Sequence, residues 1–272
     1  MFRVTWIFSL LLGLLGCTNP LDDPLPVSTP KMVVQGWITD RPGPHEVVLS
    51  TTAPFDSNQP TPKIAGATVM IVDDQGAVYP LFESSRAGYY QTADTARGVV
   101  GRSYALKVFT KESMQYQSLP ESLVAVPSIE SFSCISDENQ QGITGSTVSI
   151  SFTDFANQPN FYRWKVFING ENKSGEVYLG IDDFIDGNQL QVELGFYESK
   201  PLDVFRIEQL SLTESGFEYL EMLTTQTFGL GTVFSPAPAP IPSNLHNVNN
   251  PNEQVLGYFG ASSVASVAFV KD

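Results

Sequence analysis

The sequence predicts a mainly β protein made of two tandem antiparallel β-sandwiches, with one helix inserted in the second. Three observations lead to this fold class. Apolar and polar residues alternate with a period of two through many short segments, which is the pattern of half-buried strands. The 21 glycines and 19 prolines of the chain separate many of these segments, as turns separate antiparallel strands. One segment near residues 215–226 instead has its apolar residues at helical spacing, which predicts the helix.

The chain begins with residues 1–16, a segment typical of a signal peptide rather than of a transmembrane helix. Arg3 precedes an uncharged apolar run that ends at Gly16, and this run is shorter than the about 20 residues needed to cross a bilayer. A positive start, a short apolar run and a small residue before the cut form the secretory pattern.

Leu14-Leu15-Gly16-Cys17 resembles the bacterial lipobox. The resemblance implies cleavage before Cys17 and acylation of this residue, which would anchor the protein in a membrane. The alternative is a plain signal peptide with an unmodified cysteine.

Residues 17–30 are expected to form the lipidated Cys17 and a flexible tether. After the cysteine, the segment has four prolines, two aspartates and few large apolar residues, so it cannot build a packed core.

The formal net charge of −14 becomes −15 when cleavage of the leader removes Arg3. This acidic balance argues against a nucleic acid partner, because phosphates select clusters of Lys and Arg. The other cysteine, Cys134, lies in a strand-like segment and is expected to be an unreactive, partly buried thiol.

Residues 31–125 are predicted to form the N-terminal β-sandwich. Its strands are expected at 32–38, 46–49, 67–72, 78–81, 88–91 and 103–108, with a turn at 74–76. The motifs Gly66-Ala67-x-Val69, Gly88-x-Tyr90 and Gly101-x-x-Tyr104 resemble those of transthyretin-like and carboxypeptidase-regulatory-like β-sandwiches. The resemblance implies a module that presents, spaces or binds rather than one that catalyses.

Residues 126–272 are predicted to form the C-terminal β-sandwich. Its strands are expected at 146–152, 161–168, 190–194 and 204–212, with a last pair around 255–259 and 266–269. Asn169-Gly170 predicts a tight hairpin, because both residues tolerate the positive φ angles of such a turn. Trp164 on a central strand is typical of immunoglobulin-like and fibronectin-like cores.

The helix near 215–226 is inserted in this second unit. Ser215 and Glu218 match a capping box, in which each side chain bonds to a backbone N–H at the start of a helix. Phe217, Leu220 and Leu223 recur on one face, so we expect this face to be buried.

An acidic segment in the second unit raises the question of a metal site. Asp182, Asp186 and Glu193 include the first and twelfth positions of a calcium loop. Phe184, however, occupies the third position, where such a loop needs an oxygen ligand, and the flanks read as strands rather than helices. We therefore expect an acidic hairpin turn and no metal, with a cation held by Asp182, Asp186 and Glu193 as the alternative.

The sequence shows no recognisable catalytic or cofactor motif. His45 and His246 are its two histidines, and neither belongs to a metal-binding pattern. A nucleophile elbow, a phosphate-binding loop and a dinucleotide fingerprint are all missing from the sequence. We therefore expect no catalytic residues and no cofactor. Asp94-Thr95-Ala96 resembles the acceptor for O-glycosylation in Bacteroidota envelope proteins, which makes Thr95 a candidate site.

Several short motifs spread over nearly the whole chain carry a family resemblance. They are the lipobox, Val33-Val34-x-Gly36-Trp37-Ile38-Thr39-Asp40, Gly43-Pro44-His45-x-Val47-x-Leu49-Ser50, Gly66-Ala67-x-Val69, Asp183-Phe184-Ile185-Asp186-Gly187, Pro242-x-Asn244 and Leu256-Gly257-Tyr258-Phe259. Together they resemble the Bacteroidota outer-membrane lipoprotein family known as domain of unknown function 4249. Residues 246–250 depart from the pattern, since relatives have glycine there. The resemblance implies a lipoprotein often encoded beside TonB-dependent receptors, and it implies no known reaction.

The expected function is that of a non-catalytic envelope lipoprotein, anchored in the outer membrane through Cys17, that binds a ligand or supports a TonB-dependent receptor. Which face of the membrane carries it stays open. An envelope hydrolase of glycans or peptides with an unrecognised carboxylate site is one alternative, and an adhesin-like spacer is another. An open strand edge or exposed apolar patch would favour a partner, whereas a cleft lined by converging carboxylates would favour the enzyme.

Overall fold

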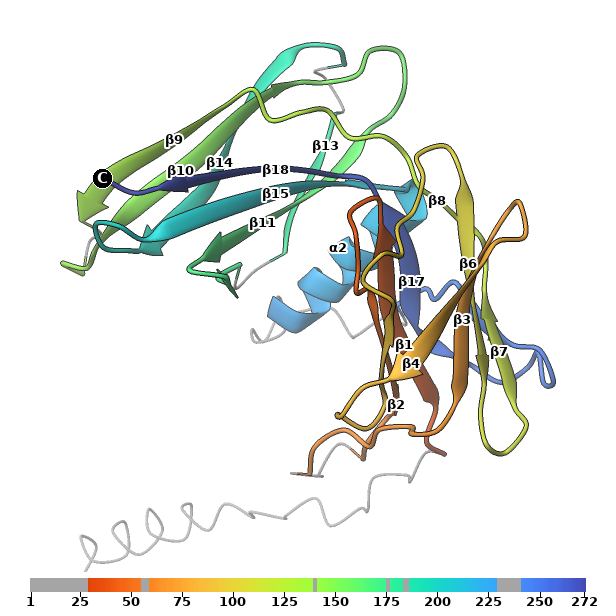
Figure 1. Cartoon of the computed structure of the whole chain (residues 1–272). Helices are drawn as coiled ribbons and strands as arrows, with labels where there is room; N and C mark the ends of the chain where they lie inside the picture. Colours follow the sequence, from red (N-terminus) through yellow and green to blue (C-terminus); the bar gives the residue numbers. More distant parts are fainter. Residues whose placement is uncertain (1–28, 55–58, 139–140, 175–176, 183–185, 229–240) are drawn as a thin grey trace, which may run out of the picture.

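The computed structural model of the chain describes residues 29–54, 59–138, 141–174, 177–182, 186–228 and 241–272. In these ranges the protein is mainly β, with three sheets and one helix (Figure 1). All strand pairings between named strands are antiparallel except that of β1 with β17. The structure thus confirms a mainly β protein with antiparallel sheets.

The first sheet runs in the order β16-β7-β6-β3-β4-β5-β2-β1-β17, and β8 pairs with β6 outside this path. Its strands are β1 (Met32–Thr39), β2 (Glu46–Thr51), β3 (Thr68–Asp73), β4 (Val78–Glu83), β5 (Tyr89–Thr92), β6 (Ser103–Phe109), β7 (Gln115–Ser118), β8 (Glu121–Ser122), β16 (Leu245–Asn247) and β17 (Leu256–Ser262). The sheet folds over, because β17 at one end of the path contacts β6, β8 and β16. Tyr104, Leu106 and Val108 alternate inward along β6 and are fully buried in the enclosed core.

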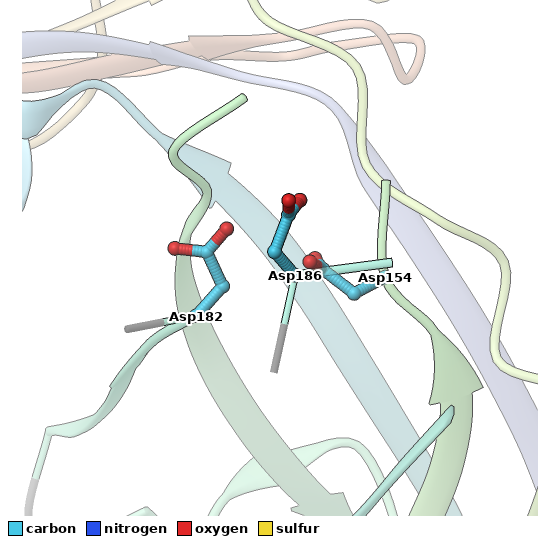
Figure 2. Close-up of side chains that lie close together, drawn as sticks. All are labelled: Asp154, Asp182 and Asp186. Carbon is cyan, nitrogen blue, oxygen red and sulfur yellow. The ribbon is translucent and has the colours of Figure 1, made fainter. Parts of the chain in front are cut away.

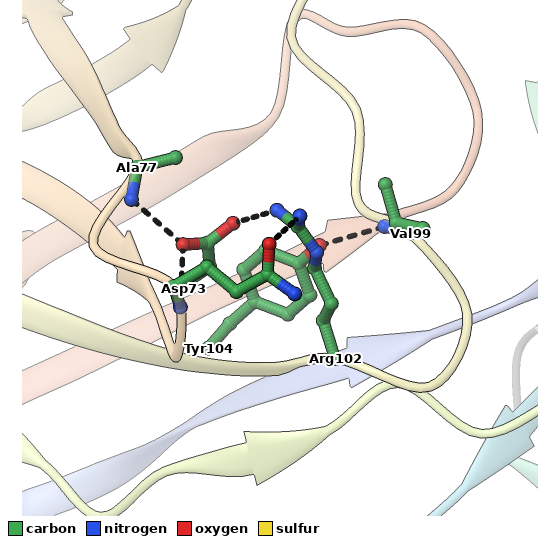
Figure 3. A network of polar contacts seen from close by, with 6 residues as sticks. Asp73, Ala77, Val99, Arg102 and Tyr104 are labelled. Carbon is green, nitrogen blue, oxygen red and sulfur yellow. Dashed lines mark hydrogen bonds and ion pairs between the residues drawn. The ribbon is translucent and has the colours of Figure 1, made fainter.

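An ion pair between a buried carboxylate and a partly exposed guanidinium closes the turn between β3 and β4 (Figure 3). Asp73 accepts hydrogen bonds from the backbone N–H groups of Gln75 (3.1 Å) and Ala77 (2.7 Å) and from the Arg102 guanidinium. Arg102 also donates to the Gln75 side chain. The turn expected at 74–76 is therefore confirmed, and a cation from the start of β6 holds it.

β17 is the strand that returns from the C-terminal part of the chain to the first sheet. It pairs in parallel with β1 over seven residue pairs, from Val33 with Leu256 to Thr39 with Ser262. Gly257 has φ +94°, and a Cβ at this position would lie 1.9 Å from the Val34 carbonyl oxygen. This close approach therefore requires glycine.

The sequence predicted that the last two strands both belong to the second unit, but the structure places them in different sheets. β17 joins the first sheet, while β18 (Val264–Val270) joins another. The reason is that β17 is buried on both sides: Phe259 lies in the core of the first sheet and Tyr258 stacks on Tyr219 of the helix at 4.8 Å. A strand covered on both faces has no alternating pattern that could reveal its partner. The division into consecutive units at residues 125 and 126 stays a prediction.

The remaining two sheets face each other. One has the order β14-β10-β9, and the other has the order β12-β11-β15-β18 with β13 paired to β11. Their bounds are β9 (Ser131–Glu138), β10 (Thr144–Thr153), β11 (Phe161–Ile168), β12 (Glu171–Asn172), β13 (Tyr178–Ile181), β14 (Gln189–Glu198) and β15 (Val204–Leu212). A second core fills the space between them and contains Phe152, Trp164 and Ile207.

Two local predictions for this part are confirmed. Trp164 is 3% exposed, and its indole N–H donates to the Gln209 side chain at 2.9 Å. Asn169 and Gly170 have φ angles of 52° and 84° and connect the paired strands β11 and β12. Positive φ at both positions is what a tight primed turn requires.

The helix α2 (Glu214–Phe228) lies against the outer face of the sheet formed by β11 and β15, away from β9, β10 and β14 (Figure 1). Phe217, Leu220 and Leu223 pack inward, as predicted. The predicted capping box is wrong: Thr213 accepts the Gly216 N–H at 3.1 Å and so caps the helix. Ser215 instead bonds to side chains of the first sheet, because the cap lies two residues earlier, at Thr213, than the box assumed.

Candidate functional site

Of the candidate residues Cys17, Thr95 and Glu193, the structure places the last two. Cys17 lies outside the residues that the structure describes. Thr95 is exposed in a turn after β5, beside the exposed Asp94, so a modifying enzyme could reach its hydroxyl. Glu193 is exposed on β14.

An acidic cluster forms where β10 and β13 end and β14 is about to begin (Figure 2). Asp154 directly follows β10, Asp182 directly follows β13, and Asp186 precedes β14 by three residues. One carboxylate oxygen from each lies within 4.8 Å of the others. Asp154 and Asp182 are buried, whereas Asp186 is exposed. The cluster therefore has one side open to solvent.

Hydrogen bonds from the protein hold each of the three carboxylates. The donors are the Tyr162 hydroxyl and the Gly187 N–H (3.3 Å) to Asp154, the Asn160 amide to Asp182 (3.3 Å), and the Asn157 N–H to Asp186 (2.6 Å). Burial, followed by the hydrogen bond to Asp154, raises the pKa of Tyr162 above its ordinary value. The Tyr162 hydroxyl thus stays protonated as a donor.

The dimensions of the cluster are those of a site for a hard cation. Two oxygens bound to one Ca²⁺ at about 2.4 Å lie at most about 4.8 Å apart. The same carboxylates are also satisfied by the protein's own donors, so the cluster can equally serve to tie three strand ends together. The calcium alternative from the sequence named Asp182, Asp186 and Glu193; of the described residues, the structure groups the first two with Asp154 instead.

Asp154 was missed because its proximity depends on strand register. β10 and β14 are antiparallel neighbours with Thr153 opposite Gln189, so the residue after β10 must meet the residues before β14. No spacing of residues along the sequence predicts this contact. Only a correct pairing of residues 144–153 with 189–198 could have found it.

Two cavities lie among the described residues of the second part of the chain. The larger, of about 620 Å³, lies among residues that include Asn169, Phe196 and Lys200. The smaller, of about 240 Å³, lies among residues that include Val124 and Phe161. Neither cavity is lined by an aspartate of the acidic cluster. The larger cavity is instead lined by three other carboxylates, those of Glu171, Glu198 and Asp203, and the smaller one by Glu214.

Two strand edges are open on the same side of the second part of the molecule. Within the described residues β9 pairs only with β10, and β18 pairs only with β15. The edges lie close together, since Phe132 of β9 stacks on Phe269 of β18 at 4.0 Å. Ile135 and Val270 expose 64% and 56% of their surfaces there. Open edges of this kind can accept a strand from another protein.

In the part of the chain that the structure describes, no helix is both long and apolar enough to span a membrane. A search of curated proteins gave no match. A comparison with protein families matched residues 18–267 to the family described as Domain of unknown function (DUF4249). Because the match covers most of the 272 residues, the chain belongs to the DUF4249 family.

Proposed function

We propose that this protein is a lipoprotein of the Bacteroidota outer membrane that acts without catalysis as an accessory partner of a TonB-dependent receptor. In this proposal the open edges of β9 and β18 receive an extended segment of the receptor. The single observation that carries the proposal is the unprotected state of these edges. The identity of the receptor class rests on the family resemblance.

The edge of β18 lacks the features that normally prevent strand addition. Its seven residues, Val264–Val270, contain no charged residue and no proline, although proteins usually place such residues on exposed edges. β9 has charges only at its end, at Asp137 and Glu138. Strand addition would pair the free backbone groups, while Ile135 and Val270 would supply apolar contacts.

The proposed anchor and tether would bring the edges to a membrane partner. Several acyl chains on Cys17 would hold the protein at the bilayer durably, because each buried methylene contributes about 0.8 kcal/mol. A tether of 17–30 in extended geometry reaches roughly 40 Å at about 3.1 Å per residue. Tethering raises the effective concentration to about the millimolar range, so a modest strand-pairing interface would be occupied.

Two other functions remain as alternatives with less support. The envelope hydrolase would need carboxylates either from the cluster of Asp154, Asp182 and Asp186 or from the larger cavity. Both buried members of the cluster already accept hydrogen bonds from the protein. At the cavity, Glu171 pairs with Lys173, and Asp203 accepts hydrogen bonds from the Lys200 N–H and the Asn169 side chain. The adhesin-like spacer needs only the tandem sheets. The spacer role gives no reason for the uncharged open edge of β18.

Crosslinking in intact cells tests the proposal. We expect tagged protein to capture an outer-membrane barrel, and Ile135→Lys or Ala268→Lys to reduce the capture severalfold because a charge blunts an edge. Val78→Lys is the matched control, since Val78 is 54% exposed on β4, which has strands on both sides. Capture of no barrel, together with cleavage of glycans or peptides by purified protein, would replace the proposal with the hydrolase.

The anchor has its own test. Metabolic labelling with a fatty acid should mark the wild-type protein and leave Cys17→Ala unmarked. Label retained by Cys17→Ala would refute acylation at this residue.

A further inference from the structure

Positive charges gather on the outer face of the sheet that α2 covers. Residues directly opposite each other on paired strands point to the same face. Arg163 of β11 lies opposite Leu210 of β15, Lys165 opposite Glu208, and Phe167 opposite Arg206. The intervening residues of β11 point into the second core. The outer face therefore carries three cations and one anion within two neighbouring strands.

The one carboxylate on these strands is already used by Arg206. Glu208 forms an ion pair with Arg206, whose guanidinium also lies 3.8 Å from the centre of the Phe167 ring. Arg163 and Lys165 have neither a hydrogen bond nor an ion pair from their side chains to the described residues around them. The Arg163 Nε is buried and has no hydrogen-bond partner. Among the residues that the structure describes, these two positive charges have no counterion.

This arrangement is costly in the free protein. Burying a charge without a partner opposes folding by several kcal/mol unless an opposite charge or hydrogen bonds compensate it. Burial, reinforced by Arg163 and Arg206, lowers the pKa of Lys165 to about 8. Glu218 and Glu221 of the covering helix are exposed to solvent, while the apolar residues of the helix face the sheet.

We propose that Arg163 and Lys165 form a binding site for a compact oxyanion, the carboxylate or phosphate head group of a small ligand. The two side chains stand two residues apart on one strand, about 7 Å along it, so both can reach one head group. The planar guanidinium can donate two parallel hydrogen bonds to such a group, and the ammonium adds a point charge. Phe161 and Phe167 flank the cations on the same face and supply apolar walls. Binding neutralises the unpaired charge.

Binding of two probe anions to the purified full chain tests this site. Inorganic phosphate and succinate are titrated separately by calorimetry and thermal unfolding, against sodium chloride at equal ionic strength. We expect at least one anion to bind and raise the melting temperature. Arg163→Met and Lys165→Gln should each weaken that binding about tenfold or more, the effect of losing a charge-assisted contact. Binding of phosphate alone assigns a phosphate ligand, and binding of succinate alone assigns a carboxylate.

The matched control is Arg97→Met, which removes an exposed cation far from this face in sequence, in the loop after β5. It should bind the anion as the wild type does. Arg163→Met without ligand should be at least as stable as the wild type, because an unpaired charge is removed. Anion stabilisation equal in all variants, or absent from the wild type, overturns the proposal. If Arg163→Met fails to fold, the loss of anion binding in Lys165→Gln tests the proposal by itself.

Discussion

Asp73 is a single residue on which the geometry of the β3–β4 turn depends. Its carboxylate is surrounded by two backbone N–H groups and the Arg102 guanidinium (Figure 3). Burial by itself would raise the pKa of Asp73, but the hydrogen bonds of Ala77 and Gln75 and the charge of Arg102 outweigh it and hold the pKa below its ordinary value. The ionised carboxylate therefore stabilises the folded state.

Replacing Asp73 by asparagine should reveal this contribution through its pH dependence. Asparagine can still accept the backbone hydrogen bonds, but it loses the charge, so we expect a loss on the order of 1–2 kcal/mol near pH 7. A lowered folded pKa gives stability that is present above the unfolded value and is lost as the pH falls through the folded pKa. The difference between wild type and Asp73→Asn should thus shrink below about pH 4. Urea unfolding of both proteins from pH 7 to pH 3 measures it.

Glu171→Gln is the control for this measurement. It removes a carboxylate from the exposed pair with Lys173, and exposed pairs contribute little. A constant difference between wild type and Asp73→Asn across the whole pH range would contradict the stabilising role of the charge.

Single residues also show what the sequence could and could not predict. Trp164 was correctly predicted to be buried, because an aromatic residue in a strongly alternating strand has one face to occupy. Asp154, Arg163 and Lys165 were not singled out, since their significance depends on which strands pair and on which charges lack partners. Strand pairing and charge pairing both depend on residues that are far apart in the sequence. The helix cap at Thr213 was missed because a nearby serine fitted the local pattern equally well.

At the scale of elements, β17 holds the C-terminal part of the chain to the first sheet. Because β17 is buried on both faces, the sequence did not predict its pairing with β1. In contrast, β1 to β6 were all predicted, since their apolar and polar residues alternate more clearly. The parallel pairing with β1 places Gly257 against Val34. The first sheet is therefore completed by residues more than 200 positions away.

Gly257→Ala should weaken this pairing strongly. The new Cβ would lie 1.9 Å from the Val34 carbonyl oxygen at a φ of +94°, so the strands must separate and more than about 3 kcal/mol should be lost. Gly76→Ala is the matched control, because Gly76 also has a positive φ, +84°, but open space around it. It should cost only about 1–2 kcal/mol, the penalty of the left-handed conformation. Equal losses in the two variants, by chemical denaturation, would show that the contact with β1 is unimportant.

At the scale of the whole molecule, hydrogen bonds join the first sheet to the second part of the chain. The Asp40 carboxylate accepts the Val264 N–H at 2.9 Å, next to the end of β1. Buried Glu121 of β8 accepts the hydroxyls of Tyr258 (2.6 Å) and Thr213 (2.7 Å). Thr213 also caps α2, so one carboxylate links β8, β17 and the start of the helix. These contacts predict that the two parts unfold together.

Calorimetry on two core variants tests this cooperativity. Leu106 is fully buried in the core of the first sheet and Trp164 in the second core. Leu106→Ala should cost about 2–5 kcal/mol and Trp164→Ala about 3–5 kcal/mol. Since β17 and Glu121 join both parts, we expect one thermal transition that either substitution moves to lower temperature, with equal calorimetric and van't Hoff enthalpies. Two separate transitions, each moved by only one substitution, would mean that the parts fold independently and that β17 is a removable strand.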